Sequence, residues 1–70
     1  MAELTSPISG KVFQVHVAVG DKVETDDEVM VLEAMKMETP IFASQNGTVK
    51  EIKVAIGENV SEDQVLMVLE

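Results

Sequence analysis

An internal repeat occupies most of this 70-residue chain. The segment Gly10 to Glu33, GKVFQVHVAVGDKVETDDEVMVLE, aligns without a gap with Gly47 to Glu70, GTVKEIKVAIGENVSEDQVLMVLE, at an offset of 37 residues. Eleven of the 24 aligned positions are identical. A repeat of this kind indicates one supersecondary unit used twice, in which each unit needs its neighbour to bury its apolar face. We therefore expect a single domain, residues 1–70, built from two quasi-identical halves related by a pseudo-twofold axis.

Each unit carries the patterns of β-strands. Residues 15–19 and 52–56 alternate apolar side chains with polar or small ones, which is typical of half-buried strands. Val12 falls out of phase with this alternation by one residue, which predicts a β-bulge or a sharp twist near Phe13–Gln14 and another at the matching place, Lys50–Glu51. The predicted inward positions are Val15, Val17, Val19, Ile52, Val54 and Ile56.

The second part of each unit contains a turn and a strongly apolar run. Gly20 and Gly57 supply the positive φ that a tight turn needs. The runs VMVL and VLMVL that follow are long enough for strands buried on both faces, and the polar segments ETDDE and SEDQ before them are predicted turns. The chain has no cysteine, so no disulfide can stabilise so small a domain. We expect an all-β fold in which the halves bury each other, a flattened β-barrel or sandwich.

Between the repeats lies AMKMETPIFASQN, whose last part loosely matches the N-terminal MAELTSPISG. Lys36 therefore falls where the last strand of the first half gives way to the first strand of the second. This position predicts the tip of a hairpin, with the two chain termini at the opposite end of the molecule. Asn46–Gly47 is a tight-turn signal, and Pro7 and Pro40 favour extended edge strands.

Composition excludes several functions. The formal net charge is −8, with 13 acidic and five basic residues, which argues against a nucleic-acid backbone as a partner. No stretch reaches the roughly 20 apolar residues of a membrane-spanning helix, and the first ten residues do not resemble a signal peptide. We expect no membrane association and a cytoplasmic location, or the mitochondrial matrix if the chain is part of a eukaryotic carboxylase.

Few residues are candidates for catalysis or metal binding. His16 falls opposite the inward valines and matches Lys53 in the second unit, so a surface imidazole is expected rather than a ligand or a base. The pairs Asp26–Asp27 and Glu62–Asp63 lack the density of oxygen ligands in a calcium loop. We assign no metal and no catalytic residue.

The midpoint EAMKMET, Glu33 to Thr39, remains unexplained by these patterns. Met35 and Met37 could be core residues, because methionine commonly fills gaps in cores. Their place at a hairpin tip favours exposure instead, and exposed apolar side chains bring no stability to the fold.

At this motif the chain resembles the biotinyl domains of biotin-dependent carboxylases, which are related to the lipoyl domains of 2-oxoacid dehydrogenases. EAMKM matches the biotinyl hallmark Glu-Ala-Met-Lys-Met, and the resemblance spans nearly the whole chain. SPISG is similar to the family's Ala-Pro-Met-Pro-Gly; it retains Pro7 and Gly10 and differs at Ile8 and Ser9. The gapless repeat leaves no room for the protruding thumb of some bacterial carriers. The resemblance is therefore to thumbless domains with the barrel-sandwich hybrid fold.

This resemblance implies a specific function for the midpoint. Lys36 would carry covalent biotin, attached by a biotin protein ligase that deprotonates the lysine amine; Met35 and Met37 would be the flanking motif and Glu33 a ligase-recognition residue. The domain would be a non-catalytic biotin carboxyl carrier, monomeric by itself, that shuttles a carboxyl group between a biotin carboxylase and a carboxyltransferase.

Two other functions stay open at this point. Lys36 could carry lipoate for acyl transfer, although lipoyl lysines typically follow Asp and here both neighbours are Met. The chain could also be an unmodified structural hybrid-barrel domain, but such a barrel has no reason to expose Met-Lys-Met.

Overall fold

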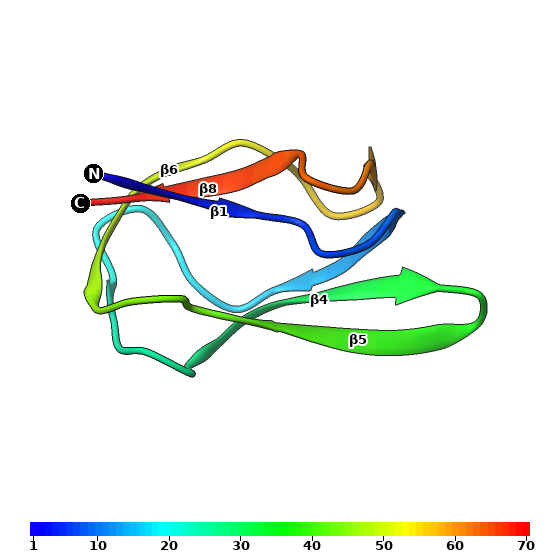
Figure 1. Ribbon diagram of the computed structural model, residues 1–70, viewed down its shortest axis with the longest axis horizontal. Helices are drawn as coiled ribbons and strands as arrows, with labels where there is room; N and C mark the ends of the chain where they lie inside the picture. Colours follow the sequence, from blue (N-terminus) through cyan, green and yellow to red (C-terminus); the bar gives the residue numbers. More distant parts are fainter.

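The computed structural model describes residues 1–70, which form eight strands and no helix (Figure 1). The strands are β1 (Ala2–Thr5), β2 (Gly10–Val15), β3 (Lys22–Val23), β4 (Glu28–Ala34), β5 (Met37–Phe42), β6 (Gly47–Ile52), β7 (Asn59–Val60) and β8 (Val65–Leu69). No element is a helix of the length and hydropathy needed to cross a membrane.

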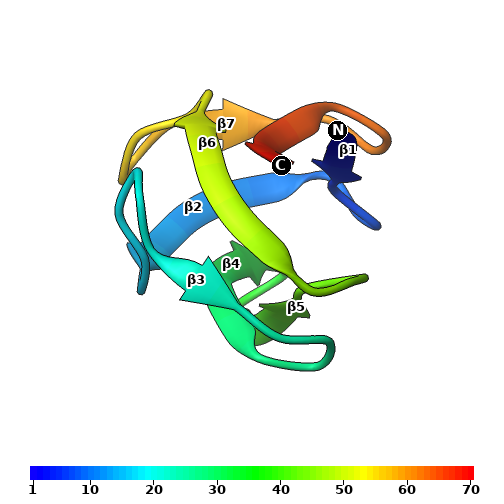
Figure 2. The ribbon, with the colours of Figure 1, turned by 90° about the vertical axis from the view of Figure 1, so that its left-hand side faces the viewer.

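The strands form two four-stranded sheets that face each other. One sheet has the order β1-β8-β6-β3 and the other β5-β4-β2-β7, and every pairing is antiparallel. Each half contributes two strands to each sheet: β1 and β3 join β6 and β8 in one sheet, and β2 and β4 join β5 and β7 in the other (Figure 2). The all-β flattened barrel-sandwich with pseudo-twofold symmetry is confirmed.

The core lies between the sheets and draws on both halves. Its largest fully buried side chains include Met30 and Leu32 of β4, and Met67 and Leu69 at the matching positions of β8. The apolar runs are therefore buried strands, as predicted. Fourteen buried residues form one continuous cluster, so neither half has a core of its own.

Reciprocal hydrogen bonds join the two halves. The Gly20 N–H donates to the Val49 carbonyl, and the Gly57 N–H donates to the Val12 carbonyl, each at 2.8 Å. Both glycines have the predicted positive φ, 97° and 91°. The turn of each half is thus attached to the long strand of the other, next to its bulge. Both predicted bulges are confirmed, because the register shifts between Val12 and Gln14 in β2 and at the matching place in β6.

The prediction of a strand over residues 15–19 is wrong except for its first residue, and the same error occurs in 52–56. β2 ends at Val15 and β6 at Ile52. Val19 is 63% exposed because it is a corner residue of the turn that the Asp21 N–H closes by bonding the Ala18 carbonyl. Ile56, at 67% exposed, has the same place in the second half, whereas Val54 is buried.

Asn46–Gly47 does not form the predicted tight turn. Neither residue has a positive φ, and β5 and β6 belong to different sheets. The Asn46 side chain instead accepts a hydrogen bond from the Thr25 N–H at 2.8 Å. Pro40 lies in the edge strand β5 as predicted, while Pro7 lies in a bend between β1 and β2 rather than in a strand.

We predict that Val54→Ala lowers the free energy of unfolding by about 1 to 3 kcal/mol, because it removes two buried methyl groups and leaves a cavity. Ile56→Ala is the matched control: it lies two residues further along the chain but is exposed, so its effect should stay within about 0.5 kcal/mol. Chemical denaturation of both variants measures the difference. Equal losses would show that Ile56 belongs to the core.

Candidate functional site

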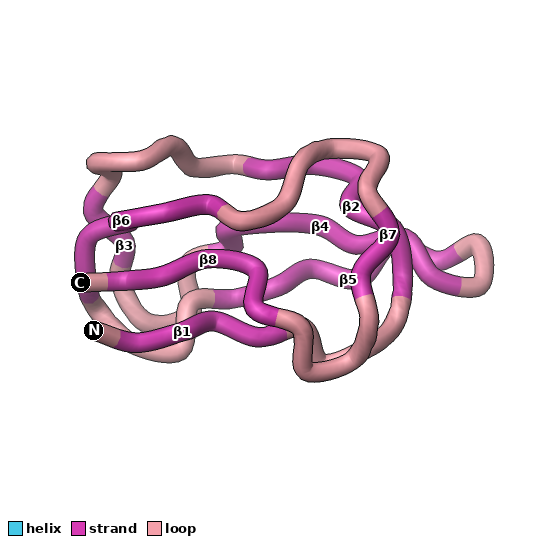
Figure 3. Tube along the Cα trace, turned by 90° about the horizontal axis from the view of Figure 1, so that it is seen from above, coloured by secondary structure: helices cyan, strands magenta, loops and turns pink.

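The hairpin between β4 and β5 projects from one end of the molecule, and the termini lie together at the other end (Figures 1 and 3). Ala34 pairs with Met37, which leaves Met35 and Lys36 as a two-residue turn. Their φ angles are 53° and 64°, as in a type I′ turn. The predicted position of Lys36 at the hairpin tip is confirmed.

This turn has an unfavourable sequence for its shape. Type I′ turns prefer Asn-Gly because both central residues need a positive φ. For an L-residue other than glycine, the left-handed conformation costs roughly 1–2 kcal/mol. Strained backbone of this kind concentrates at functional sites. The strain at Met35 and Lys36 therefore points to a role for their side chains outside folding.

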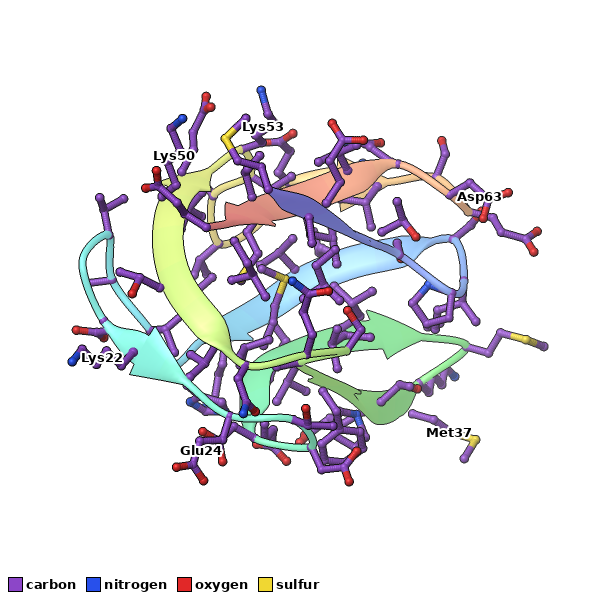
Figure 4. All side chains as sticks on the ribbon, turned by 60° about the vertical axis from the view of Figure 1, so that its left-hand side comes forward. Lys22, Glu24, Met37, Lys50, Lys53 and Asp63 are labelled. Atoms are coloured by element: carbon purple, nitrogen blue, oxygen red, sulfur yellow. The ribbon has the colours of Figure 1, made fainter.

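Met35 and Met37 are not core residues. Their exposed fractions are 95% and 68%, and the Met37 side chain points away from the sheets (Figure 4). The gap-filler interpretation is therefore wrong for both. Two flexible, polarisable side chains are instead offered to solvent beside Lys36, and this composition suits adaptable contacts with more than one surface.

Lys36 makes no hydrogen bond and no ion pair. The two ion pairs of 4 Å or less join His16 to Glu28 and Lys53 to Glu51. The amine at the tip is accessible, so a group attached to it would extend away from the sheets. These residues fit a covalent attachment site: the tip has space, a nucleophile and no competing contact.

Glu33 lies at the base of the same hairpin. It is exposed on β4, directly across from Glu38 on β5 and from Lys11 on β2. Neither carboxylate takes part in an ion pair. Two like charges opposite each other on neighbouring strands destabilise the pairing slightly. A basic surface placed against this pair would offset the repulsion between the two carboxylates.

A shallow depression beside the hairpin brings together residues from three separate parts of the sequence. It is lined by Ser9, Gly10, Lys11, Glu33, Ala34, Met35, Asn59 and Val60. A Cβ on Gly10 would lie 2.8 Å from the Glu33 carbonyl oxygen, so glycine lets β2 approach β4 there. No local sequence pattern places Asn59 and Val60 at this end, because only the pairing of the two-residue strand β7 with β2 brings them there.

His16 lies far from the tip. Its Nε2 is 2.9 Å from a Glu28 carboxylate oxygen, at the start of β4, while the hairpin tip follows the end of that strand. The imidazole is on the surface, as predicted. The site therefore consists of an accessible amine, two exposed thioethers and two unpaired carboxylates on one hairpin.

Comparison with known proteins identifies the family. The profile described as "Biotin-requiring enzyme" matches residues 2–69. The chain belongs to this family. A "Biotin/lipoyl attachment protein" from Bacillus subtilis (strain 168) is 48% identical over 40 residues, which are 57% of this chain and 55% of that protein. A "Biotin carboxyl carrier protein" from Streptococcus mutans is 44% identical over 45 residues, 64% of this chain and 35% of that protein.

The fold of this biotin-requiring family member has close structural neighbours. The crystal structure of the Kluyveromyces lactis urea carboxylase superposes with a TM-score of 0.92 and 33% identity, over 99% of this chain and 6% of that one. The chain thus corresponds to a small part of a large enzyme and to about half, or less, of the two curated relatives above.

We predict that Met35→Gly is more stable than Met35→Ala. Both variants lose the thioether, but only glycine adopts the positive φ without the steric cost of a Cβ. The expected difference in the free energy of unfolding is about 1 kcal/mol, which chemical denaturation resolves. Greater stability of the alanine variant would show that the turn is not strained at this position.

Proposed function

We propose that residues 1–70 act as a single biotin carboxyl carrier domain, with biotin attached to Lys36. The observation that carries the proposal is the free, exposed amine at the strained tip of the projecting hairpin. Membership of the biotin-requiring family supports it, as do relatives named for biotin attachment and carboxyl carriage.

Attachment uses the nucleophile that the hairpin presents. The Lys36 amine, once deprotonated by a biotin protein ligase, attacks the acyl carbon of biotinyl-adenylate; an amide bond forms, the acyl–phosphate bond breaks and AMP leaves with the electron pair. The domain supplies presentation and the ligase supplies catalysis. Glu33 and Glu38, one strand pair behind the turn, lie within reach of a basic surface on the ligase.

The domain has no catalytic role of its own in the later steps. Attached biotin supplies the chemistry of carrying a carboxyl group between a biotin carboxylase and a carboxyltransferase. The hairpin holds the arm away from the sheets, and Met35 and Met37 offer apolar contacts to each enzyme in turn. Tethering of this kind raises the local concentration to about millimolar for a short flexible link.

The domain would work as part of a larger assembly. It spans 35% of the Streptococcus carrier and 6% of the urea carboxylase chain, so its enzyme partners would be supplied by other domains or subunits. Selectivity for the final carboxyl acceptor would belong to the transferase. The isolated domain would be monomeric, since its net charge of −8 opposes self-association.

Biotinylation should depend on Lys36 alone. Lys36→Arg keeps the positive charge but removes the nucleophilic amine, so co-expression with a biotin protein ligase should leave this variant without biotin by intact mass and avidin binding. Lys53→Arg, an exposed lysine outside the hairpin, should be modified like the parent. Biotin retained on Lys36→Arg would contradict the assignment.

The lipoyl alternative is tested in the same experiment. Co-expression of the parent chain with a lipoate ligase in place of the biotin ligase should leave the mass unchanged. Lipoylation with no biotinylation would overturn the carboxyl-carrier proposal in favour of an acyl carrier. An unmodified chain in both experiments would favour the structural-barrel alternative.

Met35 and Met37 should matter to transfer and not to folding. The double variant Met35→Ala/Met37→Ala removes two exposed side chains, so its unfolding free energy should stay within about 1 kcal/mol of the parent. Carboxylation of its attached biotin by a cognate carboxylase should be slower. Thermal unfolding and a transfer assay with labelled bicarbonate measure the two effects. A large drop in melting temperature with normal transfer would contradict this prediction.

A further inference from the structure

The outer face of the β5-β4-β2-β7 sheet carries exposed apolar side chains that the core does not use. Phe13 is 40% exposed and Phe42 is 48% exposed, and neither is part of the core cluster. Val31, buried but also outside that cluster, pairs with Gln14 on one side and Pro40 on the other. Phe13, Val31, Pro40 and Phe42 are called the apolar strip below.

The internal repeat shows which positions of the strip the fold requires to be apolar, because each position has an equivalent in the other half. At an offset of 37, the positions of the strip correspond to Lys50, Val68, Glu3 and Thr5 on the outer face of the other sheet. Val68 is buried outside the core cluster and pairs with Glu3 and Glu51, as Val31 pairs with Pro40 and Gln14. Only the central valine is common to both faces.

The strip is therefore not needed to build the sheet. The same backbone positions are filled by lysine, glutamate and threonine in the other half, with the same bulge and the same pairing. Figure 4 shows Lys50 on the face opposite to the hairpin strands, with its side chain extending into solvent. Aromatic residues exposed on one of two equivalent faces mark that face as an interaction surface.

Carboxylates flank the strip on β4 and β5, while on β2 the cation Lys11 lies opposite Glu33. Glu28 is the strand partner of Phe42, and Glu33 and Glu38 form the pair between the strip and the hairpin tip. Of the three, only Glu28 is in an ion pair, with His16. An apolar centre with an acidic rim is complementary to a protein surface with an apolar centre and a basic rim. A second copy of this chain would bring the same acidic rim and is disfavoured.

The strip is set back from the tip. Val31 and Pro40 form the third strand pair behind Ala34 and Met37, about 10 Å along the hairpin at roughly 3.3 Å per residue. An enzyme that acts on the lysine amine must enclose the tip itself. An enzyme that receives the far end of a long attached arm leaves room for that arm and contacts the domain further back.

We propose that the apolar strip is the docking surface for the biotin carboxylase that acts on the arm at Lys36. This inference rests on the proposed function. The carboxylase binds two anions, ATP and bicarbonate, so cations near the entrance of its site would face the Glu28, Glu33 and Glu38 rim. Contact through the strip would fix the distance between the two proteins, while Met35 and Met37 would contact the carboxylase beside the arm.

The test compares Phe13→Thr/Phe42→Thr with the control Val19→Thr/Ile56→Thr. Both pairs lose two exposed apolar side chains without a change of charge, and Val19 and Ile56 lie in the turns away from the strip. All variants are made in the parent and in the Lys36→Arg background, and binding of the unmodified chains to a purified cognate biotin carboxylase is measured by calorimetry. The strip pair should weaken binding at least about tenfold, as aromatic anchors of interfaces do, and the control pair less than about twofold.

Kinetics with the biotinylated chains separate docking from other effects. The strip pair should raise the KM of the carboxylase for the carrier at least about tenfold, with kcat nearly unchanged, and leave the rate with free biotin unaltered. Biotinylation by the ligase should proceed as in the parent. Impaired biotinylation or transferase discharge with normal carboxylase binding, or equal losses in the control pair, would overturn the proposal.

Glu38→Lys is a second test variant, in which weaker binding to the carboxylase cannot be explained by a loss of stability. The lysine would face Glu33 across the strands and replace a repulsive pair by an attractive one, so the melting temperature should not fall. Binding to the carboxylase should nevertheless weaken, mainly through a slower association rate. Unchanged association would overturn the basic-partner part of the proposal. A parent chain that is never biotinylated would instead disprove the proposed function and is seen before any binding is measured.

Discussion

The structure depends on the exchange of strands and hydrogen bonds between its two halves. Each half donates the N–H of its glycine turn to the long strand of the other, through Gly20 to Val49 and Gly57 to Val12. The apolar strands β4 and β8 supply the largest side chains of one shared core. A chain of 70 residues without cysteine has little stability to spare, and this arrangement lets two short units bury surface that neither could bury alone.

The symmetry is interrupted where the function is placed. In the first half, β4 continues through a two-residue turn into its partner β5, whereas β8 of the second half pairs with β1, from the start of the chain. Neither residue of the Met35–Lys36 turn belongs to the core cluster. Because the turn is outside the cooperative core, the fold tolerates its strained backbone. For the same reason, core packing does not restrict which side chains the turn carries.

The two outer faces show the same separation of roles. Residues that agree between the halves, such as Val31 and Val68, maintain the fold, while the residues around them differ: aromatic side chains and proline on one face, lysine, glutamate and threonine on the other. An internal repeat thus identifies surface residues that folding leaves free. The acidic pair Glu33–Glu38 lies between this surface and the hairpin tip, so that the tip, the rim and all of the strip except Phe13 of β2 lie on β4 and β5.

The sequence by itself determined the repeat, the buried strands, the bulges and the place of Lys36 at a hairpin tip, because each of these leaves a local record in periodicity, phase or repeat boundaries. The tertiary structure decided the rest. Val19 and Ile56 follow the strand period but are turn corners, because the glycine after each bonds to the other half. Asn46–Gly47 is not a hairpin turn, because its flanking strands lie in different sheets. The grouping of Asn59 with the hairpin and of Phe13 with Phe42 depends on pairing between segments far apart in the chain, and a local pattern carries no information about such pairing.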